Sequence, residues 1–486
     1  MSEPAAPGSS AQSQASPAPV AAASGVRQSV WALAGGKGGV GRSLLCANLG
    51  IQLARMGRRV VLVDLDLQGS NLQSYLGFQR MPRTLADFAS GKVRLLSEIA
   101  CETPTGHLRL VGGLQRGEAG DDPVAFVRQV AAQFGTLHAD QVLVDCGSGR
   151  FPATIAAFAE ATVGILVTTP EPAALEGTYL FTESYLRWCL VRALTGERMA
   201  EVDRRLRDGG HDTARASFRG FMTRLGAIDP DARDTIAGVV RRTRLELVLN
   251  QVRGETDEEA TASLQSGFRK CFGLNLQTAG AIEHDLSILQ SVQKRRPLSQ
   301  QYPNAASTKG IARAATRLLA VSGAPLREAD EEWEDLDAID HYRVLEVVPK
   351  ASPKEVQSAY QLLKKTYDPE TTVLAPLMDA PGLREMQARI ESAYRTLIFL
   401  ESRSDYDRRL LDKGRDRDRQ PGAPSPAAAP AAPVEPAGEG GTMEMAGGNS
   451  PPMTPPPAPA STATSDRATV SPEEPDATSP TPVTAA

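Results

Sequence analysis

The chain has 486 residues, which is enough for about three domains of ordinary size. Apolar residues make up 41% of it and charged residues 23%, and the formal net charge of −5 excludes a strong attraction of the whole molecule for nucleic acid. The 5 cysteines form no C-x-x-C pair, which argues against a disulfide framework and a zinc site. No apolar run reaches the length of a membrane span and no signal-peptide pattern is present, so we expect a cytoplasmic protein.

Composition divides the sequence into five parts. Residues 1–27 and 413–486 are rich in Ala, Ser and Pro, and we expect both segments to be disordered. Residues 28–320 alternate apolar strand patterns with helical patterns, which predicts an α/β domain with a mostly parallel, doubly wound sheet. Residues 321–337 are acidic and we interpret them as a linker. Residues 338–412 have helical periodicity and predict a small all-α module.

Within the α/β domain the elements follow a regular order. We expect strands at residues 29–34, 59–63, 107–113, 141–145, 163–168 and 245–250, and helices at 44–56, 123–134 and 307–319. An aspartate, Asp285, precedes a further short helix that a proline ends. Because a parallel strand needs a crossover to reach the next one, this order favours strands joined by helices on both faces of one sheet.

The first strand and the first helix are joined by Gly35-Gly36-Lys37-Gly38-Gly39-Val40-Gly41-Arg42-Ser43. Glycines let successive N–H groups point at an anion, and the start of a helix adds free N–H groups and the positive end of its dipole. We expect phosphates to lie against Gly36, Lys37, Gly38, Gly39, Val40, Gly41, Arg42, Ser43 and Leu44. The alternatives are a glycine-rich turn without a ligand, and a binding loop that has lost catalysis because arginine stands at position 42 where lysine is usual.

Aspartates follow two of the other strands. Asp64 and Asp66 come after the strand at 59–63, and Asp145 ends the strand at 141–145 and is followed by glycines. In an open α/β sheet, ligands bind at the carboxyl ends of the strands, so these carboxylates should lie near the loop. There they can serve a magnesium ion and an attacking water. For Asp64 and Asp66 taken alone, the alternative is an ordinary turn at the end of a strand.

Together these segments resemble the MinD/ParA family of P-loop ATPases with a deviant Walker A loop, and most closely its FlhG members. The family loop reads KGGVGK[ST], and its early lysine corresponds to Lys37. Residues 64–71 resemble the switch I segment of the family, and residues 145–149 its Walker B and switch II segment. The resemblance implies ATP and Mg²⁺ as cofactors. It also implies a homodimer that forms on ATP binding, with Lys37 reaching the phosphates of the partner.

The resemblance also implies roles for single residues. Asp66 would position the attacking water, and Gly149 would lie near the γ-phosphate. Asn250, at the end of the strand at 245–250, would recognise adenine, although an asparagine there is also a common turn former. The metal would be held by Ser43, Asp64 and Asp145.

An arginine-rich stretch at about residues 180–244 is longer than a crossover needs. Acidic residues are interleaved with the arginines, so one interpretation is a solvated helical insert. The other is a positively charged face for DNA, an anionic membrane or an acidic partner. We also expect a protein effector to bind either at this insert or at the C-terminal module.

The module at 338–412 resembles a J-domain. Ser352, Pro353 and Glu355 open a helix as N-cap, first-turn proline and capping acid. A working J-domain needs His-Pro-Asp between its two long helices, and here the corresponding loop reads Asp368-Pro369-Glu370. We therefore expect the fold without stimulation of a DnaK-type chaperone, and an adapter role instead.

The leading functional hypothesis is an ATP-dependent dimerising switch of the MinD/ParA/FlhG class with slow ATPase activity. It would position or regulate a polar or motility complex, and the protein would be recruited to a pole or to a membrane-associated complex. Two alternatives stay open. The first is a non-catalytic nucleotide-binding scaffold, because of Arg42. The second is a ParA-like partitioning protein that rides on DNA, which predicts salt-sensitive binding to any duplex.

Overall fold

The structure is a computed structural model. It describes residues 28–194, 196–208, 218–254, 256–324, 339–368, 370, 374, 378 and 380–417. The predictions made for residues 1–27, for most of the linker, for Pro369 and for the segment beyond residue 417 lie outside the described residues.

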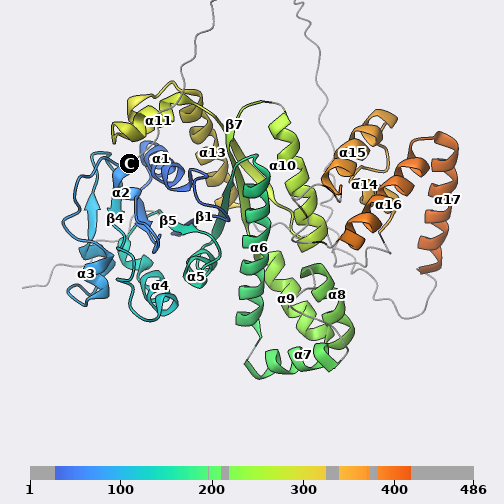
Figure 1. The fold of residues 1–486 in the computed structure, drawn as a ribbon, viewed down its shortest axis with the longest axis horizontal. Coiled ribbons are helices and arrows are strands. Elements are labelled where there is room, and N and C mark those ends of the chain that lie inside the picture. The colour runs from blue at the N-terminus through green and yellow to red at the C-terminus, as the bar shows by residue number, and fades with distance from the viewer. Residues whose placement is uncertain are drawn as a thin grey trace, which may run out of the picture. The chain divides into compact units, whose positions relative to one another are not determined.

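Within the described residues, eight strands form one sheet in the order β3-β4-β2-β5-β1-β6-β7-β8 (Figure 1). The strands are β1 (Ser29–Gly35), β2 (Val60–Asp64), β3 (Ala100–Glu102), β4 (Leu108–Val111), β5 (Gln141–Ser148), β6 (Val163–Thr168), β7 (Leu245–Val252) and β8 (Gln277–Glu283). Every neighbouring pair is parallel except β3 and β4, which confirms the predicted mostly parallel sheet. The connection from β1 runs to β2 on one side of β1, and the connection from β5 runs to β6 on its other side, so the topological switch point lies next to β1.

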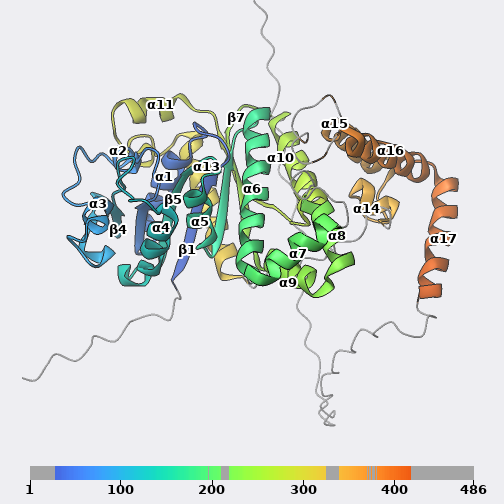
Figure 2. The same cartoon turned by 60° about the horizontal axis from the view of Figure 1, so that its bottom comes forward.

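Helices connect the strands and form the C-terminal part of the described chain (Figures 1 and 2). The α-helices are α1 (Arg42–Arg55), α2 (Leu72–Tyr75), α3 (Leu85–Ala89), α4 (Pro123–Ala132), α5 (Pro152–Ala159), α6 (Pro172–Ala193), α7 (Gly196–Asp208), α8 (Phe218–Ile228), α9 (Pro230–Arg242), α10 (Thr256–Gly267), α11 (Leu286–Gln293), α12 (Leu298–Gln301), α13 (Ala306–Gly323), α14 (His341–Leu345), α15 (Pro353–Thr366), α16 (Ala380–Leu397) and α17 (Leu400–Arg417). Short helices η1 (Leu96–Glu98), η2 (Phe134–Leu137) and η3 (Phe268–Phe272) complete the set, and η3 is a π-helix.

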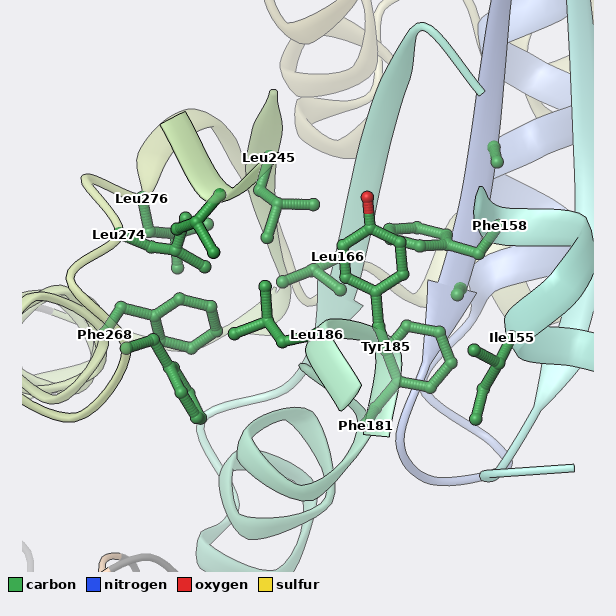
Figure 3. Packing of buried hydrophobic residues seen from close by; sticks show 14 of the residues in the cluster. Ile155, Phe158, Leu166, Phe181, Tyr185, Leu186, Leu245, Phe268, Leu274 and Leu276 are labelled. Atoms are coloured by element: carbon green, nitrogen blue, oxygen red, sulfur yellow. The ribbon is translucent and has the colours of Figure 1, made fainter. Parts of the chain in front are cut away.

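The sheet is buried on both faces because its central strands are apolar at nearly every position. Along β1, Ala32 belongs to one hydrophobic core and the next residue, Leu33, to the other. Helices α1 and α13 supply the core on the Leu33 side, and α4, α5 and α6 supply the opposite one. In that second core Phe158 packs edge to face against Phe181 and Tyr185, with ring centroids 5.1 Å and 5.2 Å away (Figure 3).

The described parts of the arginine-rich stretch at 180–244 form helices α6 to α9. Six of its described arginines form ion pairs with carboxylates: Arg187, Arg192, Arg198, Arg204, Arg205 and Arg233. Pairing of this kind cancels local charge, which favours the solvated insert over a face for DNA or an anionic membrane.

Helix α15 of the C-terminal module begins as the sequence predicted. Ser352 caps α15 through a hydrogen bond from the backbone N–H of Glu355, and the Glu355 carboxylate accepts from the N–H of Ser352 in return. Tyr360 on α15 stacks on Tyr394 on α16 at 4.0 Å between ring centroids, which holds the two long helices together. None of the helices described here has both the length and the hydropathy that a membrane span requires.

Candidate functional site

The loop between β1 and α1 has a backbone shape that suits an anion. Gly39 and Gly41 have left-handed φ angles of 86° and 85°, which residues with side chains rarely adopt. Helix α1 begins after Gly41, and no described side chain caps its first N–H groups. A Cβ atom added to Gly39 would meet nothing within 4 Å, so the loop is open on that side. These features fit a phosphate at the start of α1.

The other side of the loop packs against two elements that come later in the chain. A Cβ atom on Gly36 would lie 1.8 Å from the carbonyl oxygen of Gly177 in α6, so the two backbones touch and leave no room for a side chain. Asn250, at the end of β7, donates from Nδ2 to the carbonyl oxygen of Val40 at 2.8 Å. Asn250 therefore stabilises the loop here, and its predicted contact with adenine stays a prediction. Sequence reasoning missed Gly177, because no sequence signal marks a close approach inside a helix.

Arg42 lies inside the site. Its side chain is only 7% exposed and donates from Nη2 to Oδ2 of Asp66 at 2.9 Å and from Nε to Oδ1 of Asp145. Burial alone would lower the pKa of Arg42, but Asp145 and, more weakly, Asp66 raise it above its ordinary value. The guanidinium therefore stays charged and joins the two aspartates to which sequence reasoning gave separate roles. That contact was not predicted.

Asp145 has one carboxylate oxygen that Arg42 does not reach. Its Oδ2 atom is buried and has no hydrogen-bond partner among the described residues. A buried carboxylate oxygen without a partner is costly, so its environment fits a cation supplied from outside the chain. No described group of three or more His, Cys, Asp or Glu side chains could hold a metal alone. The remaining ligands of a magnesium ion would then include phosphate oxygens and water, beside the predicted ligands Ser43 and Asp64.

Asp64 lies beside Asp145 in the register of β2 and β5. Its carboxylate accepts hydrogen bonds from Ser70 Oγ at 2.7 Å and from the N–H of Leu72 at 3.0 Å. Burial and the neighbouring Asp145 raise the pKa of Asp64 to about 7. Through its hydrogen bonds to Ser70 and Leu72, Asp64 holds the segment that carries Asp66 close to the phosphate loop. The role of Asp64 as a metal ligand stays a prediction. The hydroxyl of Ser70 was not singled out from the sequence, although it belongs to the same segment.

The remaining predicted residues lie around the same edge of the sheet. The Nζ atom of Lys37 is 3.6 Å from the Glu171 carboxylate, and both side chains are largely exposed. Ser43 lies in the first turn of α1, with its hydroxyl 3.5 Å from Nη2 of Arg42. Gly149 has a φ of 81° and donates its N–H to the carbonyl oxygen of Gly35 at 3.1 Å. The structure gathers these residues, and their individual roles remain predictions.

Comparison with known families gives two matches. The model of the CobQ/CobB/MinD/ParA nucleotide binding domain matches residues 31–298, more than half of the chain. The model of the DnaJ domain matches residues 340–407, the region of helices α14 to α17. The predicted J-domain resemblance of the C-terminal module is therefore confirmed.

Individual relatives are more distant. A septum site-determining protein MinD from Synechocystis sp. is 32% identical over 145 residues, which cover 29% of this chain and 53% of that protein. An uncharacterized ATP-binding protein from Methanocaldococcus jannaschii is 31% identical over 140 residues, 29% of this chain and 52% of that protein. The chain thus spans about half the length of the curated relatives it matches.

Among solved structures, the septum site-determining protein MinD from Pyrococcus horikoshii, complexed with Mg-ADP, has 19% identity and a TM-score of 0.43, covering 61% of this chain and 98% of that one. A ParA family ATPase from Chlorobium tepidum has 17% identity and a TM-score of 0.40, covering 59% of this chain and 98% of that one. Because the family model itself covers most of the α/β domain, the chain belongs to the CobQ/CobB/MinD/ParA nucleotide binding domain family.

Proposed function

We propose that this protein binds ATP with Mg²⁺ at residues 36–44 and acts as a dimerising switch with slow ATPase activity. The proposal is carried by one observation: the uncapped start of α1 and the unpartnered Asp145 oxygen lie at the same edge of the sheet. An attachment point for an anion and one for a cation, side by side, suit a magnesium-bound nucleotide.

Each residue of the site would contribute a defined contact. The N–H groups of the loop and of the first turn of α1 would bind the phosphates. A bound magnesium ion would neutralise charge on the β- and γ-phosphates. Asp66 is oriented by the N–H groups of Gln68 and Gly69, which donate to its Oδ1 atom at 3.0 Å and 3.2 Å. A carboxylate fixed in this way can hold a water in one orientation, which is the role we propose for Asp66.

The switch itself would be dimerisation. Lys37 is 46% exposed and, within the described part of the chain, its side chain makes only a surface ion pair, so it can turn toward a second copy. Several of the relatives are called septum site-determining proteins. By analogy we propose that this protein also positions or regulates a cellular complex, in the manner of FlhG proteins. Its effector would bind at the insert or at the C-terminal module.

The test is to measure ATP affinity at several Mg²⁺ concentrations and to run gel filtration with and without ATP. The wild type should bind ATP and elute as a larger species with it. Lys37→Ala should bind ATP but stay monomeric. Lys92→Ala is a matched control, because Lys92 is also exposed and also forms a 3.6 Å ion pair, with Asp87. Failure of the wild type to bind ATP at every Mg²⁺ concentration would refute the proposal.

A non-catalytic nucleotide-binding scaffold is the second candidate, and the contacts of Arg42 favour it. The guanidinium is held by both Asp66 and Asp145, so its charge is already committed inside the protein. Lysine in the usual loop is a compact charge at the β- and γ-phosphates, and a planar guanidinium does not replace it without cost. The two candidates differ in expected turnover. A switch with slow ATPase activity predicts measurable ATP hydrolysis by the wild type, whereas a non-catalytic scaffold predicts none unless Arg42→Lys restores it.

A further inference from the structure

A buried ionic cluster lies where the C-terminal helices contact the α/β domain. Glu346, which follows α14, accepts hydrogen bonds from Ser266 Oγ at 2.7 Å and from Lys270 Nζ at 2.9 Å, and pairs with Arg269. The ring of Tyr367, at the end of α15, lies 5.2 Å from Lys270 Nζ, and its hydroxyl is 3.3 Å from Ser266 Oγ. We call these five residues the Glu346 cluster.

Each charged side chain of the Glu346 cluster has a partner of opposite charge, and the cluster is closely packed. Burial alone would raise the pKa of Glu346, but Lys270 and Arg269 hold it below its ordinary range, so the carboxylate is charged. Lys270 is 6% exposed and also donates to the carbonyl oxygen of Val344 at 2.9 Å. The backbone of Glu346 has a left-handed φ of 58°, which is uncommon for glutamate and persists only where the surroundings enforce it. The contact between α14 and η3 is therefore specific.

The helix turn that carries Ser266 and Lys270 also contacts α6. Tyr179 of α6 is fully buried, its ring centroid lies 5.5 Å from that of Phe268, and its hydroxyl donates to the carbonyl oxygen of Ser263 at 3.2 Å. A Cβ atom on Gly267 would lie 2.2 Å from the Tyr179 hydroxyl. Phe268 itself points into the apolar cluster with Leu274 and Leu276 (Figure 3). Because no space separates this turn from α6, a shift of the turn must also displace α6.

One of these two elements, α6, also contacts the phosphate loop. Gly177 lies two positions before Tyr179 on α6, and its backbone touches that of Gly36. Asn250 donates to Val40 from the end of β7, and α10 is the next helix after β7. The C-terminal helices therefore dock on α10 and η3, which pack against α6, and α6 in turn contacts the loop.

We propose that docking of the helical module through the Glu346 cluster stabilises the phosphate loop, so that docking and nucleotide binding strengthen each other. This inference rests on the proposed nucleotide function. Coupling between two binding equilibria is reciprocal. If docking of the module increases the affinity for nucleotide by some factor, bound nucleotide must favour docking by the same factor. A protein effector that captured the docked face of α15 would therefore lower the affinity for nucleotide.

The experiment uses the full chain, a fluorescent ATP analogue with Mg²⁺, and hydrogen exchange of the α15 amides. Glu346→Gln removes the charge at constant volume, and Glu346→Lys places a third cation beside Arg269 and Lys270. We expect faster exchange of α15 and about fivefold weaker nucleotide binding in both variants. Nucleotide should slow the exchange of α15 in the wild type. Lys365→Ala, which removes an exposed ion pair with Glu259 at the same contact surface, should leave nucleotide affinity unchanged.

Each other outcome has a defined meaning. Unchanged affinity in a variant whose α15 exchanges faster would overturn the coupling, with nucleotide binding by the wild type intact. Unchanged exchange in both variants would show that the Glu346 cluster does not hold the module. An α15 exchange rate that nucleotide leaves unaltered in the wild type would also overturn the coupling, even if both variants failed to fold. A wild type that does not bind the analogue would instead refute the proposed function.

Discussion

Two buried ionic clusters in this protein differ in one respect. At the phosphate loop a single cation, Arg42, serves two carboxylates, Asp66 and Asp145, and one buried oxygen of Asp145 has no partner in the described chain. At the contact of the C-terminal helices a single carboxylate, Glu346, is served by two cations and a hydroxyl. The first cluster has a deficit of positive charge, and the second has none.

That difference separates a binding site from a structural contact. Burying a charge is costly, and the cost is tolerated in a structural contact only when partners satisfy every atom. A cluster that leaves a buried oxygen unsatisfied stores part of that cost, and a ligand that supplies the missing charge recovers it. The comparison therefore predicts that the loop cluster responds to magnesium and nucleotide, whereas the Glu346 cluster responds to pH and to loss of a partner.

The largest expected effect is on magnesium affinity, and it follows from a change at Asp145, whose buried Oδ2 atom has no hydrogen-bond partner among the described residues. Asp145→Asn removes the negative charge but keeps the shape, so the affinity for Mg²⁺ in the presence of nucleotide should fall by about 10- to 100-fold. Isothermal titration with Mg²⁺ at saturating nucleotide measures this change. Asp140→Asn is the control, because Asp140, directly before the same strand, is also largely buried but both of its oxygens are paired with Arg59. Equal magnesium affinity in the two variants would remove the distinction between the clusters.

The second effect concerns the Glu346 cluster and pH. The pKa of Glu346 is lowered in the folded protein, so its contribution to stability is present above about pH 4.3, the ordinary value for glutamate, and is lost as the pH falls through the folded pKa. Among the described residues, the groups that face Glu346 are Arg269, Lys270, Ser266 and Tyr367.

At pH 7, Glu346→Gln should therefore weaken docking by about 2 kcal/mol, the usual net value of hydrogen bonds to a charged group. Hydrogen exchange of α15, corrected for the intrinsic pH dependence of amide exchange, measures this difference. The difference between wild type and variant should shrink as the pH falls below the ordinary pKa of glutamate and through the lowered pKa of Glu346. A difference that stayed constant from pH 7 to pH 3 would show that the charge of Glu346 is not what holds the helices.

The third effect is on turnover. If Arg42 limits hydrolysis, Arg42→Lys should raise kcat for ATP by about 10-fold, because lysine restores a compact charge that can reach the phosphates. Freed from the guanidinium, Asp66 and Asp145 would also be open to water and metal. A coupled assay of ADP release measures the change. Robust turnover by the wild type with no gain in the variant would show that arginine serves as well as lysine at this position.

Sequence reasoning located the loop cluster but not the Glu346 cluster, and the reason is physical. Gly36, Arg42, Asp66 and Asp145 follow apolar strands, and parallel strands bring their carboxyl ends to one edge, so strand order places them together. Ser266 and Glu346 are 80 positions apart on two helical segments, and no periodicity relates them.

The weaker elements were missed for a similar reason. Strand β3 is only three residues long and antiparallel, and β8 has the pattern QTAGAIE, which does not alternate. Both are edge strands whose position depends on a neighbouring strand rather than on their own sequence. The ion pairs of Arg42 were missed because a motif gives the position of a side chain on the loop but not its direction.

The smallest expected effect comes from the ion pair at the rim of the same contact surface. Lys365 and Glu259 are 2.8 Å apart, about as close as the buried pair of Lys270 and Glu346 at 2.9 Å, yet their side chains are 71% and 52% exposed. Solvent screens such a pair, so Lys365→Ala should change the docking of α15 by no more than about 0.5 kcal/mol, and less at high salt. Hydrogen exchange of α15 at low and high salt checks this. If Lys365→Ala released the module as strongly as Glu346→Gln, burial would not be what distinguishes a strong contact from a weak one here, and the contrast between the two clusters would lose its physical basis.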